Sequence, residues 1–433
     1  LQSRDSALEL AAFSLRETVA EPDALAAAAY FREEEPELFA LLESAADQSR
    51  GQLSRRAVEL LYGEKPRLSA SRIDRFASCR FLQYGLKAKP RQPAAFAPPE
   101  MGTFMHYVLE HVAGAVMEQG GFPSVTEETL HQLTDEAVER YTKEYLNDFR
   151  EKSPRFIYLF RRLISTVRAV VDDMAAELRL SQFEPLSFEL DFGNPDLIPP
   201  MEIGSGDGSL VLTGIADRVD GWEHDGKLYL RVVDYKTGKK EFSLSDVWYG
   251  MNLQMLLYLF TLEKHGPQLY GKPVVPAGVL YIPAFDKAVS SPTDLSDEEI
   301  AQEKAKQRMR SGLILQDEAV ITAMEAGEEH KYLPVTVKKR GSSVPDALAT
   351  AEQLGLLARH IDDTLQKLAG ELKAGSIAAD PYYKGQQKNA CMFCDYADAC
   401  YFEEGKHGDV RRYLPNLPAT KVWTMMEGGL DCG

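Results

Sequence analysis

Two strand-like segments joined by Asp225-Gly226 constrain the fold more than any other feature of this sequence. The stretch VLTGIADRVDGWEHDGKLYLRVVDYKTG runs from Val211 to Gly238, and alternating segments flank the dipeptide. Asp-Gly is typical of a two-residue hairpin turn, because both residues tolerate a positive φ. In such a hairpin, residues whose numbers sum to 451 lie opposite each other, which fixes the strand register.

The pairs that this register implies are chemically sensible. Trp222 falls opposite Tyr229, which makes an aromatic pair. Asp220 falls opposite Arg231, which makes an ion pair. Because such cross-strand neighbours stabilise an antiparallel sheet, the pairs support the hairpin.

The same register brings two carboxylates face to face. Asp217 falls opposite Asp234, an arrangement that is destabilising unless a positive charge lies between them. Lys236 lies on the same face as Asp234, about 6.6 Å further along the strand at ~3.3 Å per residue. Converging carboxylates bind hard divalent cations, and a neighbouring ammonium stabilises charge that develops during phosphodiester hydrolysis. A solvent-facing Asp217 and a surface Asp234–Lys236 pair are the structural alternative, but the register favours a metal site.

Composition and charge limit the classes of function. The 433 residues, of which 44% are hydrophobic, suit a globular protein with two or three domains, and no apolar run suggests a membrane span. A net charge of −17 argues against DNA binding by the chain as a whole. Three basic islands, Lys87–Arg91, Glu303–Arg310 and Val337–Arg340, are either local phosphate-binding patches or solvated faces. No GxxxxGK[ST] loop is present, so ATP hydrolysis is not expected.

Hydrophobic periodicity predicts an α/β fold, with a mixed central β-sheet flanked by helices, a helical N-terminal region and a cysteine-rich tail. Period-two alternation extends from about residue 185 to 283 and is broken by one helix from about Ser245 to Lys264. A charged, mobile segment is expected after it. The chain begins at Leu1 rather than Met, so a piece of a longer polypeptide is expected. Helices are predicted over 1–66, from Ser69 or Ser71 to near Cys79, over 101–121 ending at Gly120 and Gly121, over 125–182, and near 349–373.

The cysteines indicate a metal site rather than a disulfide framework. Their number, five, is odd, and three follow a C-x2-C-x5-C spacing at Cys391, Cys394 and Cys400. This pattern favours metal binding in a reducing compartment, and we expect a cytoplasmic location. Cys79 and Cys432 compete as the fourth ligand. Four thiolates suit either a four-iron cluster or a structural zinc, and ligand type alone does not decide.

Four motifs in this order resemble those of the RecB-type nucleases in the PD-(D/E)xK superfamily. They are GTFMHYVLEHV, GIADRVD, VVDYKTGKK and NLQMLLYLF, and the resemblance covers roughly residues 100 to 285. It implies a restriction-endonuclease-like core that cleaves DNA with Mg²⁺, or with Mn²⁺ because a histidine joins the oxygens. The implied metal ligands are His106, Asp217, Asp234 and the carbonyl of Tyr235; the implied catalytic residues are Asp217, Asp234, Lys236 and the QxxxY pair Gln254 and Tyr258, which are i and i+4 on one helix.

Three of the polar residues carry open alternatives. His106 taken alone would be a partly buried helix histidine. Glu110 shares a helix face with His106 and could orient it. Glu189, in SFELDF, is a weaker candidate whose alternative is an edge-strand charge.

The cysteine spacing resembles the iron–sulfur staple of the AddB-type subunits of bacterial AddAB helicase–nucleases. The resemblance implies that Cys79, Cys391, Cys394 and Cys400 hold a 4Fe-4S cluster, with Cys432 ranked lower. MRSGLILQD (Met309 to Asp317) also resembles a segment of these AddB-type proteins. The implied organisation is a helical segment over 1–66, a nuclease domain over 67–400 with a helical insertion at about 125–182, and an iron–sulfur tail over 386–433 that closes onto Cys79.

The implied function is that of a DNA exonuclease in double-strand-break repair and recombination. Its partners would be DNA, single-stranded at the nuclease site, and an AddA-like helicase subunit. Two other classes compete with this interpretation. One is a catalytically inactive DNA-binding or scaffold module, and the other is an electron-transfer protein, which would leave the nuclease motifs unexplained.

Overall fold

The computed structural model is an α/β arrangement in which one mixed sheet carries helices on both sides. It describes residues 3–15, 21–46, 50–85, 98–146, 153–194, 197–204, 209–238, 240–285, 296–327, 330–335, 347–406 and 408–428. The expected fold class, a mixed central β-sheet flanked by helices, is confirmed. Among the described helices, none combines the length and the apolar composition that a membrane span needs.

Six strands form the main sheet, in the spatial order β2 (Glu184–Asp191), β5 (Ile215–His224), β6 (Lys227–Lys236), β7 (Val274–Pro283), β8 (Ser311–Leu315) and β9 (Leu348–Ala349). Strands β2, β5 and β6 are antiparallel neighbours, and β7 and β8 are antiparallel as well. The β6–β7 and β8–β9 pairs are parallel, so the sheet is mixed. Strand β2 lies at one edge, next to the strand that carries Asp217.

Two smaller sheets accompany the main one. One has the order β1 (Arg67–Ser69), β4 (Leu210–Thr213), β3 (Met201–Ile203). The other is a parallel pair of β10 (Tyr382–Tyr383) and β11 (Arg412–Tyr413) within the tail.

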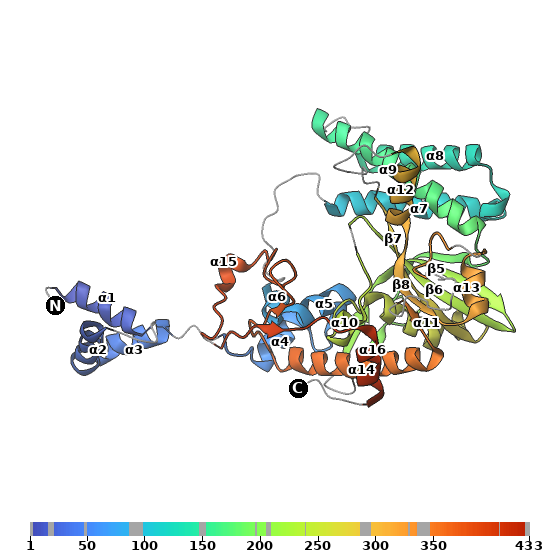
Figure 1. The fold of residues 1–433 in the computed structure, drawn as a ribbon. Coiled ribbons are helices and arrows are strands. Elements are labelled where there is room, and N and C mark those ends of the chain that lie inside the picture. Colours follow the sequence, from blue (N-terminus) through green and yellow to red (C-terminus); the bar gives the residue numbers. More distant parts are fainter. Residues whose placement is uncertain are drawn as a thin grey trace.

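Helices cover the sheet on two sides (Figure 1). On one side lie α7 (Pro98–Glu118), α8 (Glu127–Leu146) and α9 (Pro154–Arg179). On the other lie α5 (Ala70–Ser78), α11 (Gln254–Tyr270) and α14 (Ala351–Lys373). The remaining helices are α1 (Arg4–Ser14), α2 (Pro22–Glu34), α3 (Pro36–Ala46), α4 (Arg55–Tyr62), α6 (Arg80–Gly85), the 3₁₀ turn η1 (Phe122–Ser124), α10 (Leu244–Trp248), α12 (Asp297–Arg308), α13 (Glu318–Met324), α15 (Ala397–Cys400) and α16 (Ala419–Gly428).

The hairpin and several helices match the sequence expectation. Asp225 and Gly226 have φ values of 49° and 74°, as a two-residue turn of this kind requires. The observed pairs, from His224–Lys227 to Arg218–Val233, keep the predicted register. Helix α5 begins after Ser69 and ends before Cys79, and α7 is followed by Gly120 and Gly121 with positive φ. The helices predicted over 125–182 and 349–373 are α8, α9 and α14.

The single helix expected from about Ser245 to Lys264 is wrong, because the chain forms two helices there. Helices α10 and α11 are separated by a turn in which Gly250 and Asn252 have φ values of 78° and 58°. A Cβ at Gly250 would lie 2.9 Å from Cγ2 of Thr364 on α14, so the turn packs tightly against that helix. Left-handed backbone at two positions ends a helix even where apolar periodicity continues.

The segment expected to be charged and mobile also carries structure. It contains α12, β8, α13 and β9, and β8 pairs with β7 inside the sheet. A Cβ at Gly312 would lie 1.9 Å from the carbonyl oxygen of Val279, so only glycine allows this close pairing. The five residues SGLIL, set among charged neighbours, are too short to stand out as a strand in the sequence.

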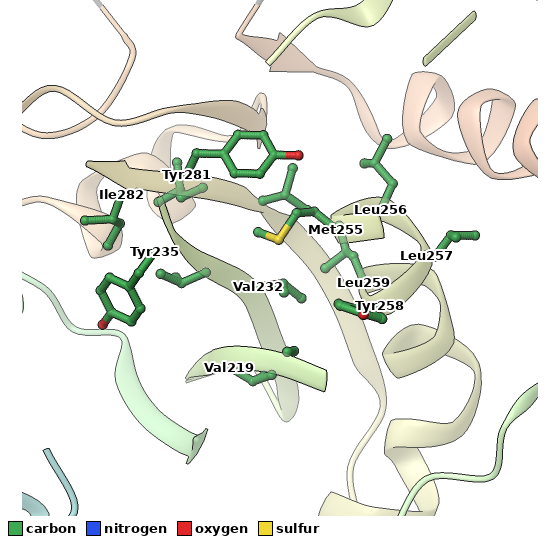
Figure 2. Close-up of a cluster of buried hydrophobic side chains, with 14 of the residues drawn as sticks. Val219, Val232, Tyr235, Met255, Leu256, Leu257, Tyr258, Leu259, Tyr281 and Ile282 are labelled. Carbon is green, nitrogen blue, oxygen red and sulfur yellow. The ribbon is translucent and has the colours of Figure 1, made fainter. Parts of the chain in front are cut away.

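The main core lies between the sheet and its helices. Figure 2 shows Val219 of β5 and Val232 of β6 facing Met255 and Leu259 of α11, and all four side chains are buried. A second, separate cluster joins α1, α2 and α3 through residues such as Phe31. In Figure 1 these three helices stand apart from the sheet.

Candidate metal centre and cysteine site

Three side chains converge where β2, β5 and α7 meet. Nδ1 of His106 lies 3.4 Å from Oε1 of Glu189 and 3.5 Å from Oδ1 of Asp217. One ligand atom from each residue lies within 4.8 Å of the other two, and all three side chains are half-buried. One imidazole and two carboxylates at this separation can hold a divalent cation.

Asp234 and Lys236 lie at the end of β6 beside this group. Oδ2 of the buried Asp234 lies 2.6 Å from Nζ of Lys236. The main-chain N–H of Tyr235 donates to Oδ2 of Asp217 at 2.8 Å, so the chain between Asp234 and Lys236 is bonded directly to the first carboxylate. The structure therefore brings together the residues predicted as metal ligands and the predicted catalytic lysine.

The centre concentrates negative charge away from water. Burial, followed by the charge of Asp234, raises the pKa of Asp217 to about 7. Burial alone would lower the pKa of His106, but a hydrogen bond to Glu189 and the nearby carboxylates outweigh it and raise the pKa to about 9. Burial also raises the pKa of Asp234. A divalent cation would relieve this repulsion, so the donor set fits a metal ion.

Gln254 and Tyr258 face the same centre from α11. Nε2 of Gln254 donates to Oη of Tyr258 at 3.2 Å, one helical turn away. Burial raises the pKa of Tyr258 to about 12, and the charges of Asp234 and Asp217 contribute to this rise. The hydroxyl thus stays protonated near the carboxylates and can donate a hydrogen bond.

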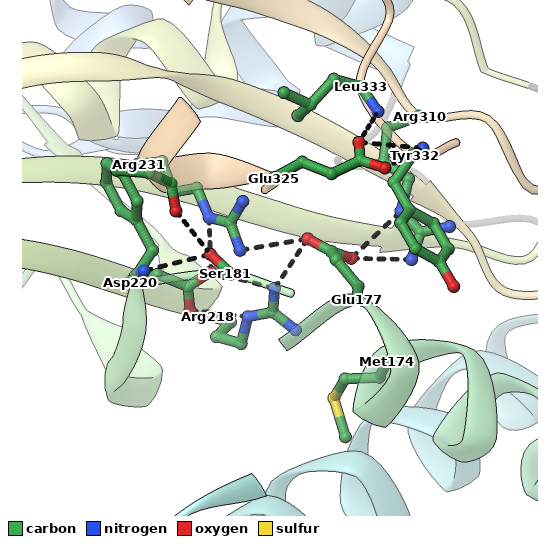
Figure 3. A network of polar contacts seen from close by, with 12 residues as sticks. Met174, Glu177, Ser181, Arg218, Asp220, Arg231, Arg310, Glu325, Tyr332 and Leu333 are labelled. Carbon is green, nitrogen blue, oxygen red and sulfur yellow. Dashed lines mark hydrogen bonds and ion pairs between the residues drawn. The ribbon is translucent and has the colours of Figure 1, made fainter. Parts of the chain in front are cut away.

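A buried network of arginines and carboxylates lies on the opposite face of the sheet (Figure 3). Glu177 of α9 accepts a hydrogen bond from Arg310 at 2.7 Å and lies 3.0 Å from Arg231. Asp220 accepts from Arg231 at 2.7 Å and from Arg218 at 2.9 Å. Asp220 and Arg231, predicted as a cross-strand ion pair, are therefore confirmed as one.

This network also holds the end of β6 that carries the metal centre. Arg218 donates to the hydroxyl of Tyr235, which in turn contacts Sδ of Met174 at 3.1 Å. Alternation along the strand sends the Tyr235 side chain to the α9 side and Asp234 to the other side. The backbone of Tyr235, whose carbonyl is a predicted ligand, is thereby fixed by its own side chain.

Glu189 and Glu110 depart from their expected roles in opposite directions. Glu189, the weaker candidate, contacts His106 and belongs to the converging group. Glu110, expected to orient His106, instead lines a hollow of about 520 Å³ with His111, Glu118 and other residues. The ladder between β2 and β5 places Glu189 opposite Asp217, but no tight turn connects these strands to reveal that register.

The four described cysteines lie at the junction after α5 and in the tail. Cys79 is buried at the end of α5, Cys391 is exposed, and Cys394 and Cys400 are partly exposed. Burial raises the pKa of Cys79 to about 11 and also raises the pKa of Cys400, on which Cys394 and Cys391 act through their charge. Ionised thiols in these surroundings need a metal or another positive charge. Cys432 lies outside the described residues.

Arginines fasten the tail to the segment that carries Cys79. Arg50 makes two hydrogen bonds of 2.9 Å to Asp409 and donates to the carbonyl of Cys400 at 2.6 Å. Arg412 donates to the carbonyl of Ser78 at 3.0 Å, next to Cys79. The two ends of the cysteine set are therefore held near each other by contacts that do not involve the sulfurs.

The sulfurs are spaced more widely than one zinc ion requires. Among the four described cysteines, no three sulfurs lie within 4.8 Å of one another. A tetrahedral zinc site with Zn–S bonds of about 2.3 Å would bring its sulfurs to about 3.8 Å from each other. The four thiols therefore fit a larger group better than a single ion.

The basic islands differ from their expected appearance. In Glu303–Arg310, Lys306 pairs with Glu303, and Arg310 is buried in the arginine–carboxylate network, so this island is not an open basic patch. The islands Lys87–Arg91 and Val337–Arg340 lie outside the described residues.

Comparison with known proteins agrees with this geometry. A sequence model of the PD-(D/E)XK nuclease superfamily matches residues 67–401. The chain belongs to the PD-(D/E)XK nuclease superfamily. The resemblance inferred from GIADRVD, VVDYKTGKK and the neighbouring motifs is therefore confirmed.

Curated relatives are all of one kind, a component of an ATP-dependent helicase/deoxyribonuclease. The protein from Clostridium acetobutylicum is 33% identical over 378 residues, which cover 85% of this chain and 32% of that protein. The protein from Thermoanaerobacter sp. is 32% identical over 379 residues, covering 86% of this chain and 33% of that protein. The protein from Clostridium novyi is 33% identical over 386 residues, covering 86% and 34%. The chain spans about a third of the length of these relatives.

Proposed function

We propose that this nuclease-superfamily chain hydrolyses DNA phosphodiester bonds in a metal-dependent reaction. The observation that carries the proposal is the convergence of His106, Glu189 and Asp217 within 4.8 Å, beside the Asp234–Lys236 pair. Mg²⁺ suits the carboxylate oxygens, and Mn²⁺ is an alternative because of the imidazole. His106, Glu189, Asp217, Asp234 and the carbonyl of Tyr235 would hold the ion.

Each residue has a distinct task in this proposal. A divalent cation at the centre supplies Lewis acidity, which acidifies water and neutralises charge on the phosphate. The Lys236 ammonium, held by Asp234, stabilises the negative charge that develops on the phosphoryl oxygens. The hydroxyl of Tyr258 and the amide of Gln254 orient the strand that is cut.

The names of the relatives supply the context. Because those relatives are named as components of an ATP-dependent helicase/deoxyribonuclease, we infer that this chain works beside an AddA-like helicase subunit in double-strand-break repair and recombination, in the cytoplasm. Within the chain, we infer a nuclease domain over 67–400 that acts as an exonuclease on single-stranded DNA.

Alanine substitution at the centre tests the nuclease assignment. Asp234→Ala and Lys236→Ala should each abolish cleavage of labelled single-stranded DNA in Mg²⁺ while leaving DNA binding largely intact. Arg168→Gln, on the exposed surface of α9, is the control and should cut like the unchanged chain. Undiminished cutting by both alanine variants would refute the assignment. A chain that binds DNA but cuts nothing in any form would be the inactive scaffold instead.

We also propose that Cys79, Cys391, Cys394 and Cys400 hold a 4Fe-4S cluster. The wide sulfur spacing and the arginine contacts around the tail support it. Anaerobically purified chain should contain about four iron and four sulfide per molecule, and Cys79→Ser should lose both. A colourless chain with one zinc per molecule would reject the cluster.

A further inference from the structure

A second lysine of the VVDYKTGKK motif lies beside the catalytic centre and has no role in the chemistry described so far. Lys240 is half-buried, and its ammonium lies 6.0 Å from the centre of the Tyr281 ring. The ammonium of Lys236 lies 5.9 Å from the centre of the same ring. Tyr281 pairs with Asp234 in the parallel β6–β7 ladder, so both ammonium groups lie near the carboxylate end of β6.

A chain of hydrogen bonds fixes the position of Lys240. Its ammonium donates to Oδ1 of Asn252, and Nδ2 of Asn252 donates to Oδ2 of Asp246 at 3.1 Å. Asp246 is buried and is paired in addition with Lys384 and with Lys388, the latter at 3.3 Å. The relay of Asp246, Asn252 and Lys240 therefore starts at tail residues shortly before Cys391 and ends at the catalytic centre.

The backbone of Asn252 shows that this arrangement is specifically maintained. Its φ of 58° is left-handed, a conformation that costs free energy for residues other than glycine and that clusters at functional sites. This conformation allows one amide to join Lys240 to Asp246. A glycine would be the cheaper residue if only the turn mattered.

Lys240 lacks a strong counter-ion in the protein. Burial lowers its pKa, and the charge of Lys236 lowers it further, while Asp74 opposes the shift. The carboxylate of Asp74 accepts a hydrogen bond from the N–H of Leu253 at 3.3 Å, and burial raises its pKa to about 6. Two neighbouring ammonium groups with a weakened carboxylate partner favour an anion from outside.

We propose that Lys240 is a second phosphate-binding lysine of the catalytic centre, positioned by Asn252 and Asp246 to hold the substrate strand beside Lys236. The inference rests on the proposed nuclease function, from which it takes the substrate class, a single-stranded polynucleotide. It assigns Lys240 to the substrate, and Asn252 and Asp246 to positioning.

The salt dependence of DNA binding tests the phosphate contact. Each phosphate contact to a single strand contributes about 0.7 to the slope of log K against log salt concentration. Lys240→Gln in the full chain should lower the magnitude of that slope by about 0.7 for a fluorescent single-stranded oligonucleotide in Ca²⁺, with Kd raised roughly tenfold. Lys240→Arg should keep the slope.

Lys264→Gln is the matched control, because it removes the same charge from an exposed position on α11. It lies ten residues beyond Gln254, about 15 Å along the helix axis, and should leave the slope unchanged. An unchanged slope in Lys240→Gln, or the same loss in Lys264→Gln, would overturn the assignment. Binding in Ca²⁺ is read without turnover, so this result is distinct from the cleavage test of the proposed function.

Asn252→Gly tests the positioning role. Glycine accepts the left-handed backbone but removes the amide that joins Lys240 to Asp246. The variant should raise KM for DNA several-fold in Mg²⁺ with kcat nearly unchanged, because Lys240 is present but no longer held. A KM equal to that of the unchanged chain would show that the relay does not position Lys240.

Discussion

At the residue scale, left-handed backbone marks the catalytic centre. Among the described residues, Glu189, Asp225, Asn252 and Tyr401 are the non-glycine positions with positive φ. Asp225 belongs to the hairpin turn, but Glu189 and Asn252 flank the carboxylates and lysines of the centre. The φ of 45° at Glu189 occurs inside an edge strand, between ladder positions Phe188 and Leu190. Because such strain persists only where the surroundings impose it, Glu189 is more than an edge-strand charge.

Glu189→Gln should weaken divalent metal binding at least tenfold, because it removes one anionic ligand and the partner of His106. Calorimetric titration with Mn²⁺ measures the change. Glu110→Gln, on the same helix as His106 but outside the converging group, is the control and should bind Mn²⁺ as the unchanged chain does. Equal affinity in all three proteins would remove Glu189 from the ligand set.

The contrast between Asp217 and Glu189 shows how far the sequence leads. Asp217 and Asp234 could be placed together from the sequence, because a two-residue turn fixes the register of β5 and β6. Glu189 could not, because strands β3 and β4 intervene between β2 and β5 and no local turn sets their register. His106 came from the family resemblance, since a helix histidine alone carries no positional signal.

At the element scale, close approach between backbone and side chains positions α11. Tyr258 stacks on Phe192, with ring centres 4.5 Å apart, and its hydroxyl reaches Gly214 at the junction of β4 and β5. The break before α11 was not visible in the sequence, because Gly250 and Asn252 interrupt a stretch whose apolar periodicity continues. Only packing against α14 reveals why the chain turns there.

Gly214→Ala should displace Tyr258, because the new Cβ would lie 2.0 Å from its hydroxyl oxygen and the buried ring cannot move freely. We expect a loss of roughly 1–3 kcal/mol in the free energy of unfolding. Turnover should fall to the level of Tyr258→Phe. Gly114→Ala, in the middle of α7 with open space around it, is the matched control and should stabilise the chain by up to about 1 kcal/mol. Full turnover in Gly214→Ala would show that the Tyr258 hydroxyl is not needed in this position.

At the scale of the whole molecule, arginines join segments that are distant in the sequence. Arg50 bonds Asp409, Arg412 bonds the carbonyl of Ser78, and Arg310 bonds Glu177 of α9. None of these pairs follows from periodicity or from a turn, because long loop closures leave no local pattern. The meeting of the tail with the Cys79 segment was expected only from the family resemblance, and Arg310 was placed in a basic island although it is buried.

The network around Glu177 should make stability depend on pH in a defined window. Burial alone would raise the pKa of Glu177, but Arg310, Arg231 and Arg218 outweigh it and lower the pKa from 4.5 to about 2. A carboxylate whose pKa is depressed in the folded state stabilises that state above its unfolded pKa. This contribution, about 3 kcal/mol, is present above pH ~4.5 and is lost as the pH falls toward ~2.

Glu177→Gln leaves buried arginines without their partner and should cost about 3–5 kcal/mol at pH 7. The difference from the unchanged chain should shrink as the pH falls from ~4.5 toward ~2, because the native carboxyl is then protonated too. Burial raises the pKa of Asp173 in the same network, which is the opposite shift, but this effect largely cancels when variant and parent are compared. Urea unfolding at a series of pH values measures the difference, with the exposed Glu184→Gln as a control that should stay within about 0.5 kcal/mol. A difference that stays constant from pH 7 to pH 3 would mean that the charge of Glu177 does not stabilise the fold.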